Sequence, residues 1–286
     1  AGWPTSSHAT MRAASMADTP VPAVRKHTEV AVGILFREDG AMLLTSRPEG
    51  KPYAGYWEFA GGKVEPSESE TDALKREFAE ELGITIHRAT PWLTKIHAYE
   101  HAHVHLRFFR VAAEDWSGVL QAKEGQQWSW QKAGDFTVSP MLPANGALLK
   151  ALAVPTELAG RLNTGLRGEN SMGEYRVVPF DMAEPRHAHV LIEERELRRI
   201  GKLPAAKSVW VVMDEAAQWP RVQDADAVVW RVENTAAAQA LEAVLAQGVS
   251  MPLVVYAAPD LLTQCGAAWR AAGAHALVAA EEIAQV

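Results

Sequence analysis

The alternation of apolar and polar positions predicts short strands in the first part of the chain. The segment Thr28–Phe36 is rich in β-branched and apolar residues, which favours a strand. Glu38–Gly40 supplies the residue types of a tight turn, so Ala41–Ser46 is predicted to return as the next strand. Further strands are expected at Leu93–Glu100, His103–Ala112 and Gln127–Gln131, with a turn at Glu114–Gly118. These segments together predict a sheet.

A helix is predicted among these strands, over Ser67–Leu82. Ser67 and Glu70 have the spacing of a capping box, which would start the helix just after Pro66. Apolar residues recur at every fourth position and form one stripe: Leu74, Phe78 and Leu82. Gly83 tolerates the left-handed conformation that ends many helices, so we expect the helix to end there.

A second helix is expected at Pro143–Ala153, where the buried side would carry Leu148, Leu149 and Leu152. The order of elements is then strands, helix, strands, helix. This order predicts an α/β/α sandwich in which helices cover a mixed sheet.

The texture of the sequence changes after Val154. Prolines and glycines predict a linker or an entry loop at Pro155, Gly160, Gly165 and Gly168. Short apolar runs then recur at Val209–Met213, Ala227–Val232, Leu253–Ala257 and Ala276–Ala279. Ala-rich helical stretches separate them, notably Ala236–Gln247 and Leu261–Ala272. This alternation predicts a smaller, parallel α/β domain.

The length of the chain agrees with two domains, since 286 residues exceed one typical small domain. We expect a flexible tail over residues 1–23, a first domain over 24–153 and a second over 154–286. The tail lacks the apolar core of a signal peptide, and we find no apolar run of about 18 residues that would span a membrane. A cytoplasmic location is therefore expected, and the oligomeric state is left open.

Charge and cysteine content narrow the functional classes. The 28 basic residues are outnumbered by 35 acidic ones, giving a net charge of −7, so a binder of nucleic-acid polymers is not expected. Cys265 is the only cysteine, which excludes an internal disulfide and a Cys-based zinc site. An acidic protein that handles phosphates generally needs a cation.

Three glutamates of the predicted helix suggest where that cation binds. Glu77, Glu80 and Glu81 stand at positions i, i+3 and i+4, so they project to a common face. Carboxylates this close repel one another, and a hard divalent cation such as Mg²⁺ would relieve the repulsion. The alternative is a solvated surface helix that happens to be rich in glutamate.

The run GGKVEPSESETDALKREFAEELGI, Gly61–Ile84, resembles the signature of the Nudix hydrolase family, G-x5-E-x7-R-E-U-x-E-E-x-G-U, in which U is an apolar residue. Every specified position is matched: Gly62, Glu68, Arg76, Glu77, Phe78, Glu80, Glu81, Gly83 and Ile84. The resemblance implies a pyrophosphohydrolase that depends on Mg²⁺, with Mn²⁺ able to substitute. The implied metal ligands are the carbonyl of Gly61 and the carboxylates of Glu77, Glu80, Glu81 and Glu124.

The same resemblance implies a catalytic set of Arg76, Glu77, Glu80 and Glu124. Arg76 would orient the carboxylate of Glu77 by a charge-assisted hydrogen bond. Glu124, in the run Lys123–Gly125, matches a downstream glutamate of related enzymes that is a metal ligand or the general base. Its alternative role is that of an exposed carboxylate in a turn.

The surroundings of the signature resemble the MutT branch of the family, which removes oxidised guanine nucleotides such as 8-oxo-dGTP. The likeness covers about Val30–Leu152. It implies that Arg47, Phe59 and Lys63 bind the substrate and that Asn145 contacts the purine edge, because an amide offers both a donor and an acceptor. Asn145 could instead cap the helix that follows Pro143, and Phe59 could be plain core.

Two features depart from this branch. Ala60 stands where the family usually has proline. The segment around the third predicted strand carries His97, His101, His103 and His105, which could form a zinc site, a polar pocket or a surface face. Markers of other Nudix branches are weaker, since Pro52 replaces an arginine of the coenzyme A branch and Tyr99 is only a weak marker for dinucleoside polyphosphate hydrolases.

The stretch Ala227–Ala279 resembles the last βα units of thiamine phosphate synthase-like barrels. Ala257–Pro259 replaces the glycine-rich phosphate-binding turn expected there, and the remaining length is short for a full barrel of over about 200 residues. We therefore expect a shortened, non-catalytic domain.

The hypothesis for the whole chain is the conversion of 8-oxo-dGTP to 8-oxo-dGMP and pyrophosphate. The alternatives are a Nudix hydrolase of another substrate, such as a dinucleoside polyphosphate or a pterin triphosphate, a nucleotide sensor that binds without cutting, and a bifunctional enzyme with thiamine-related activity.

Overall fold

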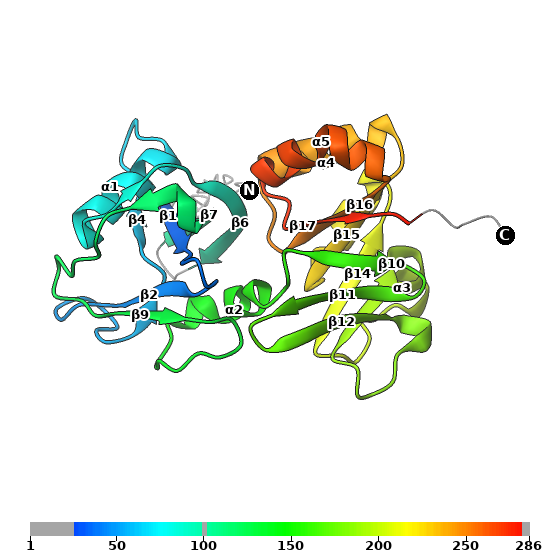
Figure 1. Ribbon diagram of the computed structural model, residues 1–286, viewed down its shortest axis with the longest axis horizontal. Coiled ribbons are helices and arrows are strands. Elements are labelled where there is room, and N and C mark those ends of the chain that lie inside the picture. The colour runs from blue at the N-terminus through cyan, green and yellow to red at the C-terminus, as the bar shows by residue number, and fades with distance from the viewer. Residues whose placement is uncertain (1–25, 99–101, 282–286) are drawn as a thin grey trace, which may run out of the picture.

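The computed structural model describes residues 26–98 and 102–281 and arranges them as two units that lie side by side (Figure 1). We call residues 26–152 the N-terminal unit and residues 158–281 the C-terminal unit. Tyr99, His101 and the tail over 1–23 lie outside the described residues. Among the described residues, none of the helices has the length and apolarity needed to span a membrane.

The main sheet of the N-terminal unit has the strand order β4-β1-β7-β6. Its strands are β1 (Lys26–Leu35), β4 (Gly61–Lys63), β6 (Thr90–Ala98) and β7 (Ala102–Val111). Strand β1 runs parallel to β7 and antiparallel to β4, and β6 runs antiparallel to β7. The prediction of a mixed sheet is therefore confirmed.

A second sheet of order β3-β2-β9 faces the first, and a short pair completes the unit. These strands are β2 (Met42–Ser46), β3 (Trp57–Glu58), β9 (Trp128–Gln131), β5 (Thr85–Ile86) and β8 (Trp116–Ser117). The prediction that β2 returns along β1 is wrong beyond one isolated bridge between Phe36 and Met42. Because β4 and β7 occupy both edges of β1, strand β2 pairs with β3 and β9 instead.

The helix predicted over Ser67–Leu82 is α1 (Glu70–Leu82), which begins later than expected. The side chain of Ser69, rather than that of Ser67, accepts the capping bond from the backbone N–H of Asp72. Ser67 cannot be the cap because its φ of 66° is left-handed, whereas a cap residue is extended. The end at Gly83, with a φ of 67°, is as predicted.

Helix α1 packs its apolar stripe on the main sheet. Leu74, Phe78 and Leu82 are fully buried, as the spacing predicted. The contact with β1 is very close, since a Cβ on Gly33 would lie 2.8 Å from the Phe78 ring. This packing sets the orientation of α1 and therefore the direction in which its glutamates point.

The closing helix begins as a 3₁₀ turn over Pro143–Asn145 and continues as α2 (Gly146–Leu152). Leu148 and Leu152 are buried and Leu149 is partly buried, so the predicted buried side is confirmed.

The C-terminal unit is one eight-stranded sheet in sequential order from β10 to β17. Its strands are β10 (Leu158–Arg161), β11 (Gly165–Asn170), β12 (Gly173–Pro179), β13 (His189–Glu193), β14 (Ser208–Met213), β15 (Ala227–Val232), β16 (Leu253–Ala257) and β17 (Ala276–Ala279). From β12 onward all neighbours are parallel. A bridge between Glu157 and Leu277 brings the two edges together, so the sheet is nearly closed into a barrel.

The region predicted as a linker is in fact the antiparallel start of this sheet, β10 and β11. Its glycines allow strands to approach closely rather than to bend freely: a Cβ on Gly160 would lie 2.2 Å from the carbonyl oxygen of Gly165. Inside the barrel lie Tyr175, Trp210 and aliphatic residues. The helices α3 (Glu194–Ile200), α4 (Thr235–Gln247) and α5 (Pro259–Ala272) follow β13, β15 and β16.

Strand β6 joins the two units. The backbone N–H of Thr94 donates to the carbonyl of Val249 at 2.8 Å, and Lys95 Nζ donates to the carbonyl of Ser250 at 2.6 Å. One cluster of buried apolar residues runs across the interface. The division into two domains with a boundary between residues 153 and 154 stays a prediction.

Candidate active site

A cavity of about 260 Å³ opens between the two sheets of the N-terminal unit. Its apolar wall comes from alternate residues of the main sheet: Val30 and Val32 of β1, and Val104, Leu106 and Phe108 of β7. The opposite wall comes from Thr45 and Ser46 of β2. The remaining lining is polar and charged, so the cavity combines a surface for an apolar ring with groups for an anion.

Two glycines of β4, Gly61 and Gly62, line the cavity and lie in very close contact with β1 and α1. A Cβ on Gly61 would lie 2.1 Å from the carbonyl oxygen of Ala31, and a Cβ on Gly62 would lie 2.3 Å from Cδ of Glu77. No other residue fits at either position without displacement. Gly62 therefore allows the carboxylate of Glu77 to lie directly against the strand.

Arg76 fixes that carboxylate in place. Its Nη1 donates to Glu77 Oε1 at 2.9 Å, while Nε and Nη2 form a fork on the carboxylate of Glu68 at 2.8 and 2.9 Å. Nη2 also donates to the carbonyl of Lys63 at 3.0 Å. The hydrogen bonds from Arg76 lower the pKa of Glu68 to about 2. These contacts are the ones that an orienting role requires; the role itself stays a prediction.

Glu81 is the helix glutamate that lines the cavity. Burial, a hydrogen bond with Glu77 and the negative charges of Glu77 and Glu124 raise its pKa to about 9. Three acidic side chains thus converge, and the cations beside them are Arg76, which bonds Glu77, and Lys51, which lies near Glu124 and Glu81. Carboxylate oxygens in this arrangement are the donor set of a hard divalent cation.

Glu80 differs from its two neighbours. Its side chain is 61% exposed, against 16% for Glu77, and lies 3.4 Å from Arg76 Nη1. The structure therefore brings Glu77, Glu81 and Glu124 together, with Glu81 and Glu124 lining the cavity, and leaves Glu80 on the exposed side of the helix.

Gln126 attaches the loop of Glu124 to the end of α1. Its buried amide accepts from the backbone N–H of Glu124 at 2.9 Å and donates to the carbonyl of Glu81 at 2.9 Å. Lys51 Nζ lies 3.5 Å from Glu124 Oε2 and also lines the cavity. Sequence reasoning missed both residues, because neither belongs to a motif and only the folded loop brings them to the site.

Asn145 also lines the cavity and is 7% exposed. It occupies the N-cap position of α2, yet its side chain makes no capping hydrogen bond. Its Nδ2 is buried and has no hydrogen-bond partner among the described residues. A buried amide donor without a partner is costly, so such a donor on a residue that lines a cavity is what a ligand could satisfy.

The other predicted substrate-binding residues also line this cavity. Arg47 donates from Nη1 to Glu58 Oε2 at 3.0 Å and from Nε to the carbonyl of Pro52 at 2.7 Å. Burial raises the pKa of Glu58 despite this pairing. Phe59 is buried, whereas Lys63 is exposed at the rim. Their contacts with a substrate stay predictions.

Comparison with known proteins agrees with this geometry. Residues 31–151 match the family described as NUDIX domain. A CTP pyrophosphohydrolase of Escherichia coli is 40% identical over 126 residues, which are 44% of this chain and 91% of the relative. An 8-oxo-dGTP diphosphatase of Haemophilus influenzae is 35% identical over 45% of this chain and 93% of its own length. An 8-oxo-dGTP diphosphatase of Escherichia coli is 32% identical, with coverages of 44% and 97%.

The fold and the site define a hydrolase that acts on phosphoric anhydride bonds. The chain belongs to the Nudix family, and its N-terminal unit is a Nudix domain of the MutT type. Nudix hydrolases generally use divalent metal ions and act on nucleotides. The family match ends at residue 151, and beyond it the structure shows a nearly closed, barrel-like sheet; the resemblance of this unit to thiamine phosphate synthase-like barrels stays a prediction.

Proposed function

We propose that the chain converts 8-oxo-dGTP to 8-oxo-dGMP and pyrophosphate with Mg²⁺, for which Mn²⁺ can substitute. The observation that carries this proposal is the buried, unpartnered Nδ2 of Asn145, a residue that lines the same cavity as Glu81 and Glu124. An amide can read a purine edge with its donor and acceptor together. Relatives named 8-oxo-dGTP diphosphatase at 35% and 32% identity support the same substrate.

In this proposal the cation binds to the glutamates of α1 and to the carbonyl of Gly61 in β4. When bound, Mg²⁺ neutralises phosphate oxygens and lowers the pKa of the attacking water. Glu77, held by Arg76, and Glu81 would supply carboxylate oxygens, and Gly61 would add its carbonyl oxygen. Glu80, whose side chain is 61% exposed, would add a carboxylate from the exposed side of the helix.

Glu124 acts as the general base in this proposal. It lines the cavity together with Glu81 and is held by Gln126 through its backbone, while its 39% exposed carboxylate lies 3.5 Å from Lys51 and is open to water. Its carboxylate accepts the proton of the attacking water as the bond between the α- and β-phosphates breaks. Lys51 and Lys63 at the rim place positive charge where the phosphates lie, and Phe59 and Arg47 line the base side.

A second candidate substrate is CTP. The relative that is 40% identical is named CTP pyrophosphohydrolase, and a cavity of about 260 Å³ accommodates a small base. The same amide of Asn145 could pair with the edge of a cytosine, so the cavity alone favours neither base.

Steady-state hydrolysis of 8-oxo-dGTP, dGTP, CTP and diadenosine tetraphosphate by the full chain, with Mg²⁺ and with product identification, tests the proposal. A kcat/KM that is highest for 8-oxo-dGTP, with monophosphate and pyrophosphate as products, would support it. A preference for CTP would replace the substrate while keeping the chemistry. Equal rates for 8-oxo-dGTP and dGTP would contradict the role given to Asn145.

A further inference from the structure

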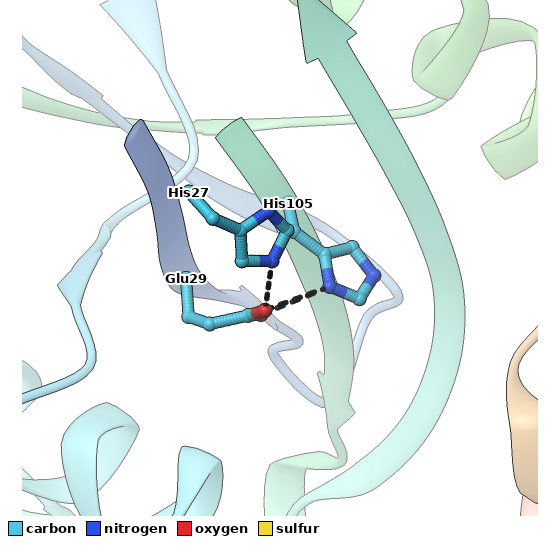
Figure 2. Close-up of side chains that lie close together, drawn as sticks. All are labelled: His27, Glu29 and His105. Carbon is cyan, nitrogen blue, oxygen red and sulfur yellow. Dashed lines mark hydrogen bonds and ion pairs between the residues drawn. The ribbon is translucent and has the colours of Figure 1, made fainter. Parts of the chain in front are cut away.

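A cluster of two histidines and one glutamate lies on the main sheet outside the cavity (Figure 2). His27 and Glu29 come from β1, and His105 comes from β7. The parallel register sets Glu29 opposite His105, and His27 stands two residues earlier on the same face. All three side chains therefore come from paired strands, and none comes from a loop.

This face is the reverse of the one that forms the cavity. Val30 and Val32 line the cavity, and the residues that alternate with them, Glu29 and Ala31, point the other way. On β7, Arg107 follows His105 on this reverse face and donates to Glu70 of α1 at 2.8 Å. Arg107 is thus paired with Glu70, and the ion pairs of the Glu29 carboxylate are with His27 and His105.

The spacing of the three groups suits a metal ion. One ligand atom from each residue lies within 4.8 Å of the other two. His27 Nε2 is 2.5 Å from Glu29 Oε1, and His105 Nδ1 is 2.9 Å from Glu29 Oε2. Ligand atoms around a tetrahedral zinc ion are separated by roughly 3.4 Å, given bonds of about 2.0–2.1 Å. Shifts of an ångström or less in flexible side chains would reach that arrangement.

The carboxylate has an oxygen that ordinary hydrogen bonding does not use. Glu29 Oε2 is shielded from solvent and has no well-directed hydrogen bond among the described residues, although His105 Nδ1 is close. The histidines remain open to incoming ions, since the side chains of His27 and His105 are 56% and 25% exposed. A plain hydrogen-bonded cluster would explain the proximity but not the unused, shielded oxygen.

We propose that His27, Glu29 and His105 bind a zinc ion or a similar borderline divalent cation, with water completing the coordination. Two imidazole nitrogens with one carboxylate favour zinc over magnesium, which prefers oxygen ligands alone. The cluster shares no residue with the set of Glu77, Glu80 and Glu81 on α1. A bound ion would also tie the beginning of β1 to β7 and so stabilise the N-terminal unit.

Zinc titration of the full chain by isothermal calorimetry, after removal of metals with a chelator, tests the proposal. Excess Mg²⁺ is included so that the carboxylate site of α1 is occupied. Wild type is expected to bind one zinc ion per chain, and His105→Gln and Glu29→Gln are expected to bind at least tenfold more weakly. His87→Gln is the matched control, because His87 is an exposed histidine of the same unit that bonds Ser117 instead.

Thermal unfolding gives a second readout that does not depend on calorimetry. Zinc should raise the Tm of wild type and of His87→Gln, because a ligand that binds only the folded state stabilises it. It should leave the Tm of His105→Gln and of His27→Gln unchanged, and His27→Gln serves if His105→Gln does not fold. Equal zinc binding by wild type and His105→Gln, or no zinc binding by wild type in excess Mg²⁺, would overturn the proposal.

Discussion

The indole Nε1 of Trp92 donates a hydrogen bond to Nδ1 of His275 at 3.0 Å, across the interface between the two units. The other ring nitrogen of His275, Nε2, lies 2.8 Å from the carbonyl oxygen of Val154. A carbonyl only accepts, so Nε2 carries the proton and Nδ1 is the acceptor for Trp92. His275 is therefore held as one neutral tautomer, buried between the units.

This neutral histidine predicts an acid-sensitive interface. Burial, followed by the positive charge of Arg110, lowers the pKa of His275 from its ordinary 6.5 to about 3. Below pH 6.5 the unfolded chain binds a proton that the folded chain refuses, so stability is lost as the pH falls from 6.5 toward 3. The contribution is at most about 1.4 kcal/mol per pH unit.

Denaturant unfolding of wild type and of His275→Gln between pH 7 and pH 4 measures this effect. The free energy of unfolding should fall more steeply for wild type, whatever the absolute stability of the variant. His189, whose pKa burial lowers to about 4, adds a slope of the same sign to both proteins. Parallel pH profiles for the two proteins would contradict the assignment to His275.

The glutamates of α1 are predicted to differ in importance. Glu77 is 16% exposed and held by Arg76, and Glu81 lines the cavity, whereas Glu80 is 61% exposed. Replacing Glu77 or Glu81 by Gln should lower kcat by roughly 10²-fold or more, and Glu80→Gln by about tenfold or less. Steady-state rates with saturating Mg²⁺ check this order, with the exposed Glu114→Gln as the control. A loss in Glu80→Gln as large as that in Glu81→Gln would refute it.

A single methyl group at Gly62 is predicted to impair catalysis. In Gly62→Ala the new Cβ would lie 2.3 Å from Cδ of Glu77, so the carboxylate must move away from its position beside Arg76. Displacement of about 1 Å in a catalytic group can cost about 10²-fold in rate. Gly146→Ala is the control, because a Cβ there meets nothing within 4 Å. Unchanged kcat in Gly62→Ala would show that Glu77 is not needed in this position.

Removing the unpartnered amide should reduce discrimination rather than chemistry. Asn145→Ala is expected to lower the ratio of kcat/KM for 8-oxo-dGTP over dGTP by roughly 10- to 100-fold, from a bidentate contact of about 1–3 kcal/mol. Asn145→Asp keeps the acceptor but loses the donor, so it should resemble Asn145→Ala. The kcat for dGTP is the internal reference, and a ratio that stays at the wild-type value would assign Asn145 a purely structural role.

Local patterns in the sequence were sufficient to predict α1 and the strands β1, β2, β6, β7, β9 and β14 to β17, but not the short strands β3, β4, β5 and β8, of which β8 lies in the predicted turn Glu114–Gly118, nor β10 to β13. The stripe of Leu74, Phe78 and Leu82 predicted the buried face correctly, because helical periodicity is a local property. The strands β14 to β17 were also predicted within one residue, since each is a buried apolar run. The glycine at the end of α1 behaves as its conformational freedom predicted.

Pairings between distant segments could not be predicted in this way. The glycine-rich segment around Gly160 and Gly165 was predicted as a linker, but it forms the paired strands β10 and β11. Glycine is required there because a side chain would clash with the neighbouring strand. The sequence also grouped His105 with other histidines of its own strand. The structure instead places His105 beside His27 and Glu29 through the parallel register of β1 and β7. That register could not be predicted, because it depends on both strands and neither sequence alone determines it.

The bond between Trp92 and His275 also sets an order of events during synthesis. The two residues are 183 positions apart, and at about 5–20 residues per second a ribosome needs roughly 9–37 seconds to add the residues between them. Throughout that interval the nascent N-terminal unit has no native acceptor for the indole N–H of Trp92. The interface is therefore a late product of translation, completed only when the strand β17 that follows His275 is made.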